Sequence, residues 1–520
     1  MHIVFLFLLA VFLFENAPLY VNREAVAATS TNNVQTFEQS KSKLLYLLQK
    51  YNNGNLKIEQ LIEQISVHDL SLLIFSSLKL TGSEIKIVDG VSIFSGVASG
   101  RACFSVDSIK KFSDPVVLVK TNMNGSDLGQ MSRISGIWLL EEDPTSHASI
   151  VIRVMSKPCV TMTKGILSKN KLLIAGKEIK EGDYITIDGT NGCIYHGSPE
   201  IIVPKDFPEF KEFMSLLNKV NKMKVYANAD LPREVMEAYR YTADGIDVRT
   251  EHMFFSPHRL QLFRKLLFTH SCDFHEKDFK SLMLAQLSDF LELFKLSNGA
   301  PVTVRLLDPP PHEFLPKNPE EEAGFANSLG IDSNQAKSLI KEVKEQNPML
   351  GFRGARLLIR RPNIIRLQCH AMFSAAKEYL KNNDGSITLK ICVPMISFIE
   401  EIDKVKVVVF ETYDKVFGKM APSYKKRFTF LFGIMVETPR IALLSDKLRD
   451  MVDFVSFGTN DLTALTFGVS RGDMADRYFD FYKKELIDGF DPFVSLDKAV
   501  MRLVEMTKHN RPLSKPHKLW

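Results

Sequence analysis

The sequence predicts an α/β protein with two successive folded parts, and three observations support this prediction. A chain of 520 residues with 45% hydrophobic side chains is long enough to bury roughly two or three cores. Residues 83–200 contain short β-type runs separated by glycine turns, which is typical of a compact β/α domain. Residues 225–520 alternate apolar runs of strand length with helical segments, and this alternation is typical of a (β/α) barrel.

The chain begins with an apolar run, from Met1 to Phe14, of the length found in signal peptides. Ala25-Val26-Ala27 follows as a small-residue sequence of the kind at which such peptides are cleaved. Residues 1–28 are therefore interpreted either as a secretory signal or as an extended start. The run is too short to cross a bilayer, and no later apolar segment is long enough, so the sequence predicts no membrane span. A cytoplasmic, an organellar and a secreted location all remain open.

Two helical segments flank the first folded part. Leucine and isoleucine residues recur at helical spacing within residues 35–82, for example at Leu44, Leu48 and Leu61. Residues 201–224 contain a second helical pattern, around Phe210, and are predicted to link the two folded parts. The predicted boundaries are therefore at residues 82, 200 and 224.

Six strands are predicted in the second part. Their residues are 225–229, 245–248, 302–307, 389–394, 432–436 and 454–457. A closed barrel of this kind has eight parallel strands. The sequence therefore predicts an incomplete, TIM-like (β/α)8 barrel.

The charge and cysteine content exclude two classes of site. The chain has 66 basic and 61 acidic side chains, a net charge of +5, and no basic stripe, so we expect no nucleic-acid binding. The six cysteines are spread singly, without the C-x-x-C spacing of a zinc site. They are predicted to be buried free thiols.

Two carboxylates indicate a metal site. Glu437 and Asp461 each follow an apolar run of strand length, beside a proline or a glycine that ends the strand. Carboxylate oxygens at neighbouring strand ends are ligands for a hard cation such as Mg²⁺. The alternative is that each residue alone is a helix cap or turn residue.

The strings around these carboxylates resemble a known family. Residues 433–473 resemble the metal-binding signature of the phosphoenolpyruvate-utilising enzymes. Residues 245–255, 304–316 and 351–357 resemble the pyruvate phosphate dikinase branch, mainly through the strings Arg-Thr-Glu-His-Met-Phe-Phe and Asp-Pro-Pro-x-His-Glu-Phe. The resemblance covers roughly residues 35–507. It implies a swivelling phosphohistidine domain at residues 83–200 and a barrel that binds phosphoenolpyruvate or pyruvate at residues 225–520.

The resemblance also implies roles for individual residues. His147, in the string Thr145-Ser146-His147, is implied to carry the phosphoryl group, and the two residues before it are good helix N-caps that would place it at a phosphate-binding helix start. The residues implied to bind substrate are Arg249, Arg305, Arg353 and Asn460. The residues implied to bind Mg²⁺ are Glu437 and Asp461. Phosphoryl transfer depends mainly on positioning and on charge neutralisation, which suits these residue types.

Relatives of this kind interconvert ATP, phosphate and pyruvate with AMP, diphosphate and phosphoenolpyruvate. We expect this activity to be impaired, because the sequence contains neither a segment for the ATP-binding domain nor the Cys-Gly-Glu string of the family's proton donor. Glu141-Glu142-Asp143 also stands where the family has a glycine pair, and these carboxylates would repel a phosphate on His147. A separate ATP-binding domain or a homodimer is the implied partner. The alternatives are a catalytically inactive fragment or binding subunit, and a phosphoenolpyruvate synthase.

Overall fold

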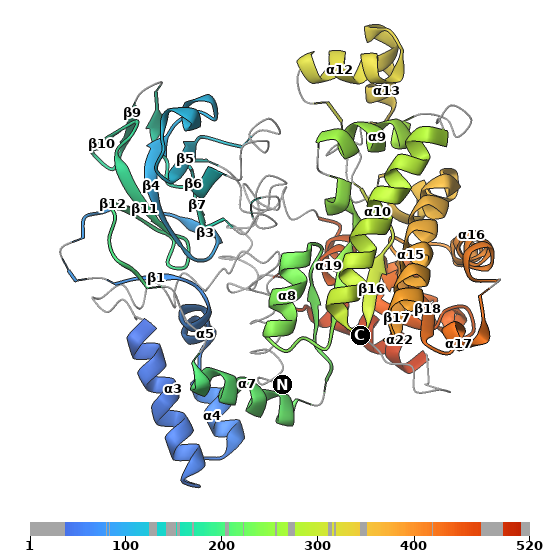
Figure 1. Ribbon diagram of the computed structural model, residues 1–520, viewed down its shortest axis with the longest axis horizontal. Helices are drawn as coiled ribbons and strands as arrows, with labels where there is room; N and C mark the ends of the chain where they lie inside the picture. The colour runs from blue at the N-terminus through green and yellow to red at the C-terminus, as the bar shows by residue number, and fades with distance from the viewer. Residues whose placement is uncertain are drawn as a thin grey trace. The chain divides into compact units, whose positions relative to one another are not determined.

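The computed structural model consists of two compact units, residues 1–223 and 224–520 (Figure 1). The structure describes residues 37–79, 81–82, 84–123, 133–141, 152, 157–168, 171–202, 207–221, 223–254, 257–268, 276–309, 315–316, 319–343, 351–418, 420–469, 492–493 and 495–510. The finer division of the chain given by the sequence stays a prediction, and each unit is described by itself.

Helices from both ends of the first unit pack together. They are α3 (Phe37–Asn52), α4 (Ile58–Gln64), α5 (Val67–Ile74) and α7 (Pro208–Val220). Helix α7 lies beside α3, where the rings of Phe37 and Phe207 meet edge to face with their centroids 6.4 Å apart (Figure 1). The segment predicted as a linker therefore packs on the helices that precede the β-rich part.

The β-rich part contains an eight-stranded mixed sheet in the order β2-β12-β11-β4-β5-β6-β7-β3. Its strands are β2 (Lys86–Asp89), β3 (Val91–Phe94), β4 (Val97–Cys103), β5 (Val116–Lys120), β6 (Ile134–Leu139), β7 (Cys159–Thr161), β11 (Tyr184–Asp188) and β12 (Cys193–His196). A three-stranded sheet is formed by β8 (Ile166–Leu167), β9 (Lys171–Ile174) and β10 (Lys177–Lys180), and β1 (Ser77–Leu78) pairs with β13 (Ile201–Ile202). The 3-10 helix η1 (Asp107–Lys111) follows β4.

Gly90 joins the two edges of this sheet. Strands β2 and β3 are separated by this residue alone, yet they occupy opposite ends of the strand order. The sheet must therefore curl until its edges meet. The Gly90 amide donates to the Gly192 carbonyl (2.8 Å), and a Cβ on Gly90 would lie 2.4 Å from the Thr161 carbonyl oxygen. This glycine therefore separates two strands that lie on different edges.

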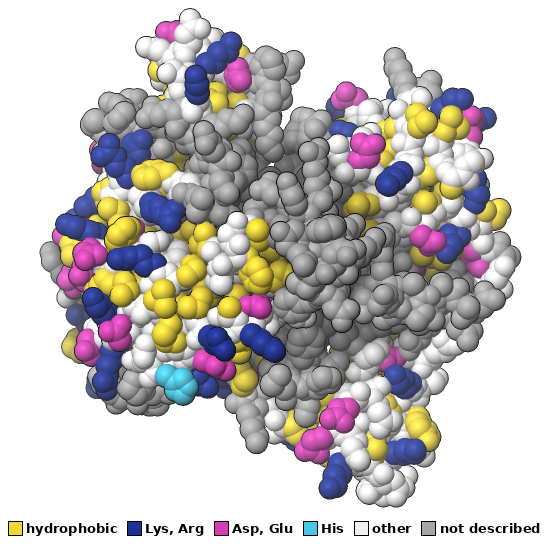
Figure 2. Space-filling view, turned by 180° about the vertical axis from the view of Figure 1, so that it is seen from behind, with side chains coloured by type: hydrophobic (Ala, Val, Ile, Leu, Met, Phe, Trp, Pro, Cys, Tyr) yellow, Lys and Arg dark blue, Asp and Glu magenta, His cyan; other side chains and the backbone are white. Residues whose placement is uncertain are grey.

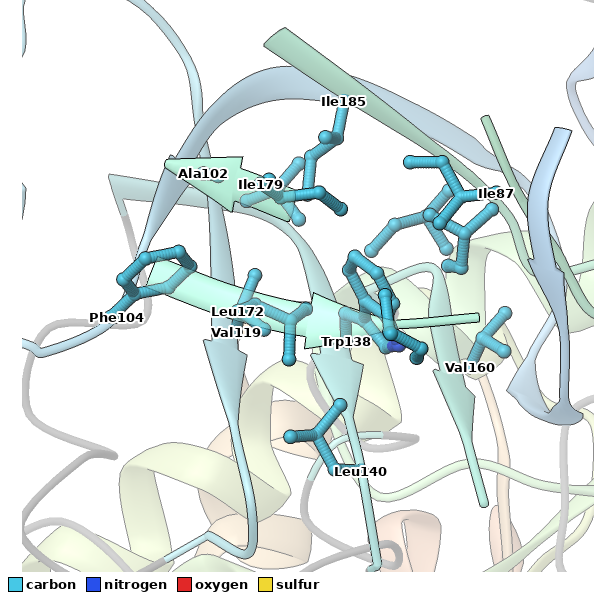
Figure 3. Packing of buried hydrophobic residues seen from close by; sticks show 14 residues of the cluster. Ile87, Ala102, Phe104, Val119, Trp138, Leu140, Val160, Leu172, Ile179 and Ile185 are labelled. Carbon is cyan, nitrogen blue, oxygen red and sulfur yellow. The ribbon is translucent and has the colours of Figure 1, made fainter. Parts of the chain in front are cut away.

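Both faces of the central strands are buried. Along β5, Val117 and Val119 face one apolar cluster while Val116 and Leu118 face another, as the alternation of a strand requires. Figure 3 shows the first cluster, in which side chains of β9 and β10 close over the sheet around Trp138. The indole of Trp138 is fully buried and donates to the Thr163 hydroxyl (2.9 Å). Its one polar atom is thus satisfied.

In its described residues the second unit contains six parallel strands in the order β14 to β19, and this arrangement confirms the predicted incomplete TIM-like barrel. The strands are β14 (Tyr226–Asn228), β15 (Gly245–Arg249), β16 (Val302–Arg305), β17 (Ile387–Val393), β18 (Phe428–Val436) and β19 (Phe454–Phe457). Helices α8 (Pro232–Arg240), α10 (Glu276–Ser297), α15 (Pro362–Asn382) and α16 (Ile399–Phe417) lie along the outside of the strands (Figure 1). The other helices described are α9 (Pro257–Phe268), α12 (Pro319–Leu329), α13 (Ser333–Val343), α14 (Gly354–Arg360), α17 (Pro422–Lys425), α18 (Pro439–Leu443), α19 (Thr459–Phe467) and α22 (Lys498–Asn510), with 3-10 helices η3 (Thr250–Phe254) and η4 (Ser445–Leu448).

The inside of the curled sheet is polar. Alternation along β15 places Ile246 and Val248 against the helices and Asp247 on the inner face. On the inner face of β17, the Lys390 ammonium donates to the Tyr226 hydroxyl (3.1 Å) and lies 5.9 Å from the centroid of the Phe454 ring. Tyr226 and Phe454 belong to the two edge strands, so the Lys390 side chain contacts a residue of each edge strand.

No helix in the described ranges is both long and apolar enough to cross a membrane; residues 1–36 are not among those ranges. On the face shown in Figure 2, basic and acidic side chains are interspersed among apolar ones. Five cysteines lie in the described residues and all are free thiols: Cys103, Cys159, Cys193, Cys369 and Cys392.

Candidate functional site

The predicted site residues of the second unit lie where its parallel strands end. Arg249 is the last residue of β15 and Arg305 is the last residue of β16, and the two are register partners. Glu437 directly follows β18, and Asp461 lies in the first turn of α19, which begins after β19. Because the strands are parallel, their C-terminal ends lie together at the same end of the sheet.

Arg305 and Arg353 are held by two buried carboxylates. Arg353 makes a bidentate pair with Asp308, from Nε to Oδ1 at 2.8 Å and from Nη2 to Oδ2 at 2.5 Å. Arg305 Nη2 lies 3.3 Å from Glu251 Oε2, an ion-pair distance without hydrogen-bond geometry. The amide of Asp308 donates to Glu251 Oε1 (2.5 Å). The four side chains therefore form one connected charge network.

This network keeps both guanidinium groups charged. Burial lowers the pKa of Arg305, but the attraction of Glu251 and Asp308 outweighs it and the pKa rises above its ordinary value. The pKa of Arg353 is also raised, because Asp308 outweighs the effect of burial. Charged, oriented guanidinium groups are suited to binding phosphate and carboxylate groups.

Glu437 has one satisfied and one unsatisfied oxygen. Its Oε1 accepts the Met395 amide at 2.5 Å, whereas Oε2 is buried without a hydrogen-bond partner among the described residues. Burial, followed by the negative charges of Asp461 and Asp308, raises the pKa of Glu437 well above its ordinary value. A Cβ on Gly458 would lie 2.4 Å from Oε2, so this carboxylate fits only against a glycine.

The donor chemistry of Glu437 and Asp461 fits a hard cation. Burial also raises the pKa of Asp461, against the effect of Arg353. A cation would satisfy the orphaned Glu437 oxygen and relieve the repulsion between the two acids. The described residues contain no group of three or more His, Cys, Asp or Glu side chains able to hold a metal by themselves. Water and ligand oxygens would have to complete the shell, as is usual for Mg²⁺.

Comparison with protein families identifies the family of this chain. Residues 205–511 match the model of the PEP-utilising enzyme, PEP-binding domain, and residues 112–192 match that of the PEP-utilising enzyme, mobile domain. The chain belongs to the PEP-utilising enzymes. The resemblance to the phosphoenolpyruvate-utilising enzymes that was inferred from the sequence is therefore confirmed.

Curated members of the PEP-utilising enzymes resemble most of this chain. It is 36% identical over 455 residues to the pyruvate, phosphate dikinase of Rickettsia felis, which covers 86% of the chain and 51% of that relative. The dikinase of Clostridium symbiosum is 34% identical (87% of the chain, 52% of the relative), and the chloroplastic dikinase 1 of Arabidopsis thaliana is 33% identical (83% and 45%). The chain spans about half the length of the curated relatives it matches.

The structure brings together most, but not all, of the residues that the resemblance selected. Arg305, Arg353, Glu437 and Asp461 influence one another electrostatically, as their pKa shifts show. Arg249 belongs to the same group, because its charge lowers the pKa of Asp461. Asn460 precedes Asp461 and is exposed. His147 lies outside the described residues.

Sequence reasoning missed four residues that shape this site. Glu251 and Asp308 are parts of the strings that carried the resemblance, so an acid close in sequence to Arg249 and to Arg305 was an available signal. Met395 contributes its backbone amide, and Gln368 lies on α15, far along the chain from Arg249 and Arg305. Neither of these two residues has a local signature in the sequence.

Proposed function

We propose that this chain is a phosphotransferase of the pyruvate phosphate dikinase type, which binds phosphoenolpyruvate and Mg²⁺ at the strand ends of its second unit. The observation that carries this proposal is the cluster of Arg305 and Arg353, locked by Glu251 and Asp308, beside a buried Glu437 with a free oxygen. These two arginines, together with Arg249 and a cation site, supply positive charge that suits a small trianionic phosphate ester.

The chain's own residues would bind and orient the substrate. Arg249, Arg305 and Arg353 would bind phosphate and carboxylate oxygens through paired N–H donors, and Asn460 would donate to a further oxygen. Glu437 and Asp461 would hold Mg²⁺, which when bound supplies positive charge to the oxygens of the transferring group. Because Arg305 and Arg353 are already held by carboxylates, little reorganisation of these two side chains would accompany binding.

His147 is proposed to accept the phosphoryl group. The bond between phosphorus and the enolic oxygen would break as a bond to an imidazole nitrogen forms, leaving the enolate of pyruvate. The family match at residues 112–192 supports a mobile domain around this histidine. The reaction with ATP and phosphate would need an ATP-binding domain, either as a separate chain or as a further segment, and a homodimer is a second proposed assembly.

The first test measures binding. Isothermal titration of phosphoenolpyruvate into the purified chain should show an affinity that depends on Mg²⁺. Glu437→Gln should abolish the Mg²⁺ dependence without unfolding the protein, because its amide oxygen can still accept the Met395 N–H. Glu401→Gln is the matched control, since Glu401 caps α16 by accepting the Ser397 amide (2.7 Å) and the Phe398 amide (3.0 Å). Equal, metal-independent binding by all three proteins would overturn the proposal.

The second test measures transfer. Incubation with phosphoenolpyruvate labelled in its phosphate should give an acid-labile protein phosphate that His147→Ala lacks. A chain that binds phosphoenolpyruvate with Mg²⁺ but never becomes labelled would instead be a binding subunit. Formation of ATP from phosphoenolpyruvate, AMP and diphosphate by the chain alone would contradict the expected impairment.

A further inference from the structure

We propose that Gln368 is a positioning residue that fixes the two strand ends carrying Arg249 and Arg305. This inference rests on the proposed function, because its purpose is to hold the binding arginines at the spacing that the substrate requires. Gln368 is fully buried on α15, and its side-chain amide forms hydrogen bonds with Leu307 and Thr250. It acts on Thr250, the first residue of the 3-10 helix η3 after β15, and on Leu307 in the segment after β16.

The amide of Gln368 joins these two loops directly. Its Oε1 accepts the backbone N–H of Leu307 at 3.0 Å, and its Nε2 donates to the hydroxyl of Thr250 at 2.7 Å. The Thr250 hydroxyl in turn donates to the carbonyl of Arg305 at 3.2 Å. A chain of three hydrogen bonds thus links Leu307 to Gln368, Gln368 to Thr250, and Thr250 to the Arg305 carbonyl.

The positions of the contacted residues explain why this chain matters for binding. Thr250 lies between Arg249 and Glu251, and Leu307 lies between Arg305 and Asp308. Gln368 therefore fixes the backbone beside both arginines and beside both carboxylates that orient guanidinium groups. A shift of either loop would change the distance between Arg305 and its Glu251 partner, now 3.3 Å.

Glutamine meets the chemical requirement at this position. The Leu307 N–H can only donate, so it needs an acceptor, and Thr250 needs a donor because its own proton is used by the Arg305 carbonyl. Glutamate in place of Gln368 offers no donor when ionised, and methionine offers neither group while filling similar volume. Loss of the amide would leave the buried Leu307 N–H without a partner.

The experiment compares variants on either side of the same hydrogen bond. Gln368→Met, Thr250→Val and the double variant are measured for phosphoenolpyruvate affinity with Mg²⁺ by isothermal titration and for thermal stability. The matched control is Gln286→Met, since Gln286 is also buried on a barrel helix but has one carbonyl oxygen without a partner and one weak contact, 3.8 Å to the Met253 sulfur.

We expect both single variants to weaken affinity about tenfold or more, as loss of supporting hydrogen bonds around a binding site generally does. The double variant should lose less affinity than the sum of the two single losses, because both single variants remove the same hydrogen bond between Gln368 and Thr250. Gln286→Met should bind like the unmodified chain. Thr250→Ser, which keeps the hydroxyl, should bind better than Thr250→Val. Full affinity in folded Gln368→Met, or a loss that Gln286→Met shares, would overturn the inference.

A second readout separates this inference from the proposed function. If the unmodified chain binds no phosphoenolpyruvate, the proposed function fails, and amide hydrogen exchange still tests the linkage. Exchange at residues 302–309 should then become faster in Gln368→Met and stay unchanged in Gln286→Met. Unchanged exchange in both variants would remove the positioning role as well.

Discussion

At the scale of single residues, the site depends on where one oxygen of Glu437 is held. The carboxylate lies under the backbone of Gly458 and keeps one oxygen free of protein hydrogen bonds. A buried acceptor without a partner is costly, so its retention indicates a ligand that the described side chains do not supply. Glu437 therefore lies against Gly458, which directly follows β19, and is also influenced by the charge of Asp461.

Gly458→Ala tests this arrangement. The added Cβ would lie 2.4 Å from Glu437 Oε2, so the carboxylate must move. We expect Mg²⁺-dependent phosphoenolpyruvate affinity to fall about tenfold or more, and the free energy of unfolding to fall by about 1–3 kcal/mol. Isothermal titration measures the affinity, and urea denaturation measures the free energy of unfolding.

Gly324→Ala is the control, because Gly324 lies in α12 with nothing within 4 Å of the added Cβ. This variant should keep its affinity and gain about 0.5–1 kcal/mol in helix stability. Wild-type affinity in Gly458→Ala would show that the Glu437 oxygen is not used.

A second prediction concerns Asp247, on the inner face of the curled sheet. Burial raises the pKa of Asp247 above the ordinary 3.8, and the negative charge of Asp230 raises this pKa further. A hydrogen bond from Thr303 and the positive charges of Lys390 and Arg249 lower the pKa, but only partly offset the rise. An acid whose folded pKa is raised stabilises the fold at low pH and loses that contribution as pH rises through the folded pKa. Asp247→Asn should therefore gain stability relative to the unmodified chain between pH 4.5 and 7.5, measured by urea denaturation at both values. A constant difference between the two proteins would contradict the raised pKa.

At the scale of elements, the two units use curled sheets in different ways. In the first unit, β2 and β3 follow one another in sequence but lie on opposite edges, so the sheet curls until its edges meet at Gly90. In the second unit, the described edge strands β14 and β19 are approached by a single side chain, Lys390, from β17. Edge strands expose unpaired backbone groups. The edges meet in the first sheet, whereas in the second sheet Lys390 contacts only a side chain of each edge strand.

Gly90→Ala should open the first sheet. The new Cβ would overlap the Thr161 carbonyl at 2.4 Å, and backbone cannot move aside as a flexible side chain can. We expect a loss of about 1–3 kcal/mol in unfolding free energy, with phosphoenolpyruvate affinity unchanged because the substitution lies in the first unit. A stability equal to that of the unmodified chain would show that the edges do not meet at Gly90.

At the scale of the whole molecule, the chain has two compact units with separate cores. Separate cores allow separate unfolding, and a ligand stabilises only the unit that binds it. We expect calorimetry to show two transitions, of which Mg²⁺ with phosphoenolpyruvate raises one, while Gly90→Ala lowers the other. A single transition that moves with both changes would contradict this division.

The sequence by itself determined the order of strands and helices, because strand-length apolar runs and helical spacing are local properties. The six strands of the barrel and the residues at their ends follow from such patterns, and the strings around Arg249, Arg305 and Glu437 were sufficient to indicate the family. The family roles of His147 and Asn460 were also readable in this way and stay proposals.

Only the tertiary structure decided how these residues are held. Gln368 bonds to Leu307 and Thr250, which are 61 and 118 positions away in the chain, and the Glu437 oxygen lies against Gly458. Gly90 divides one apolar run into strands on two edges. Such contacts are formed when distant segments close on one another, so no local periodicity or spacing encodes them, and the positioning of the site is a property of the folded molecule.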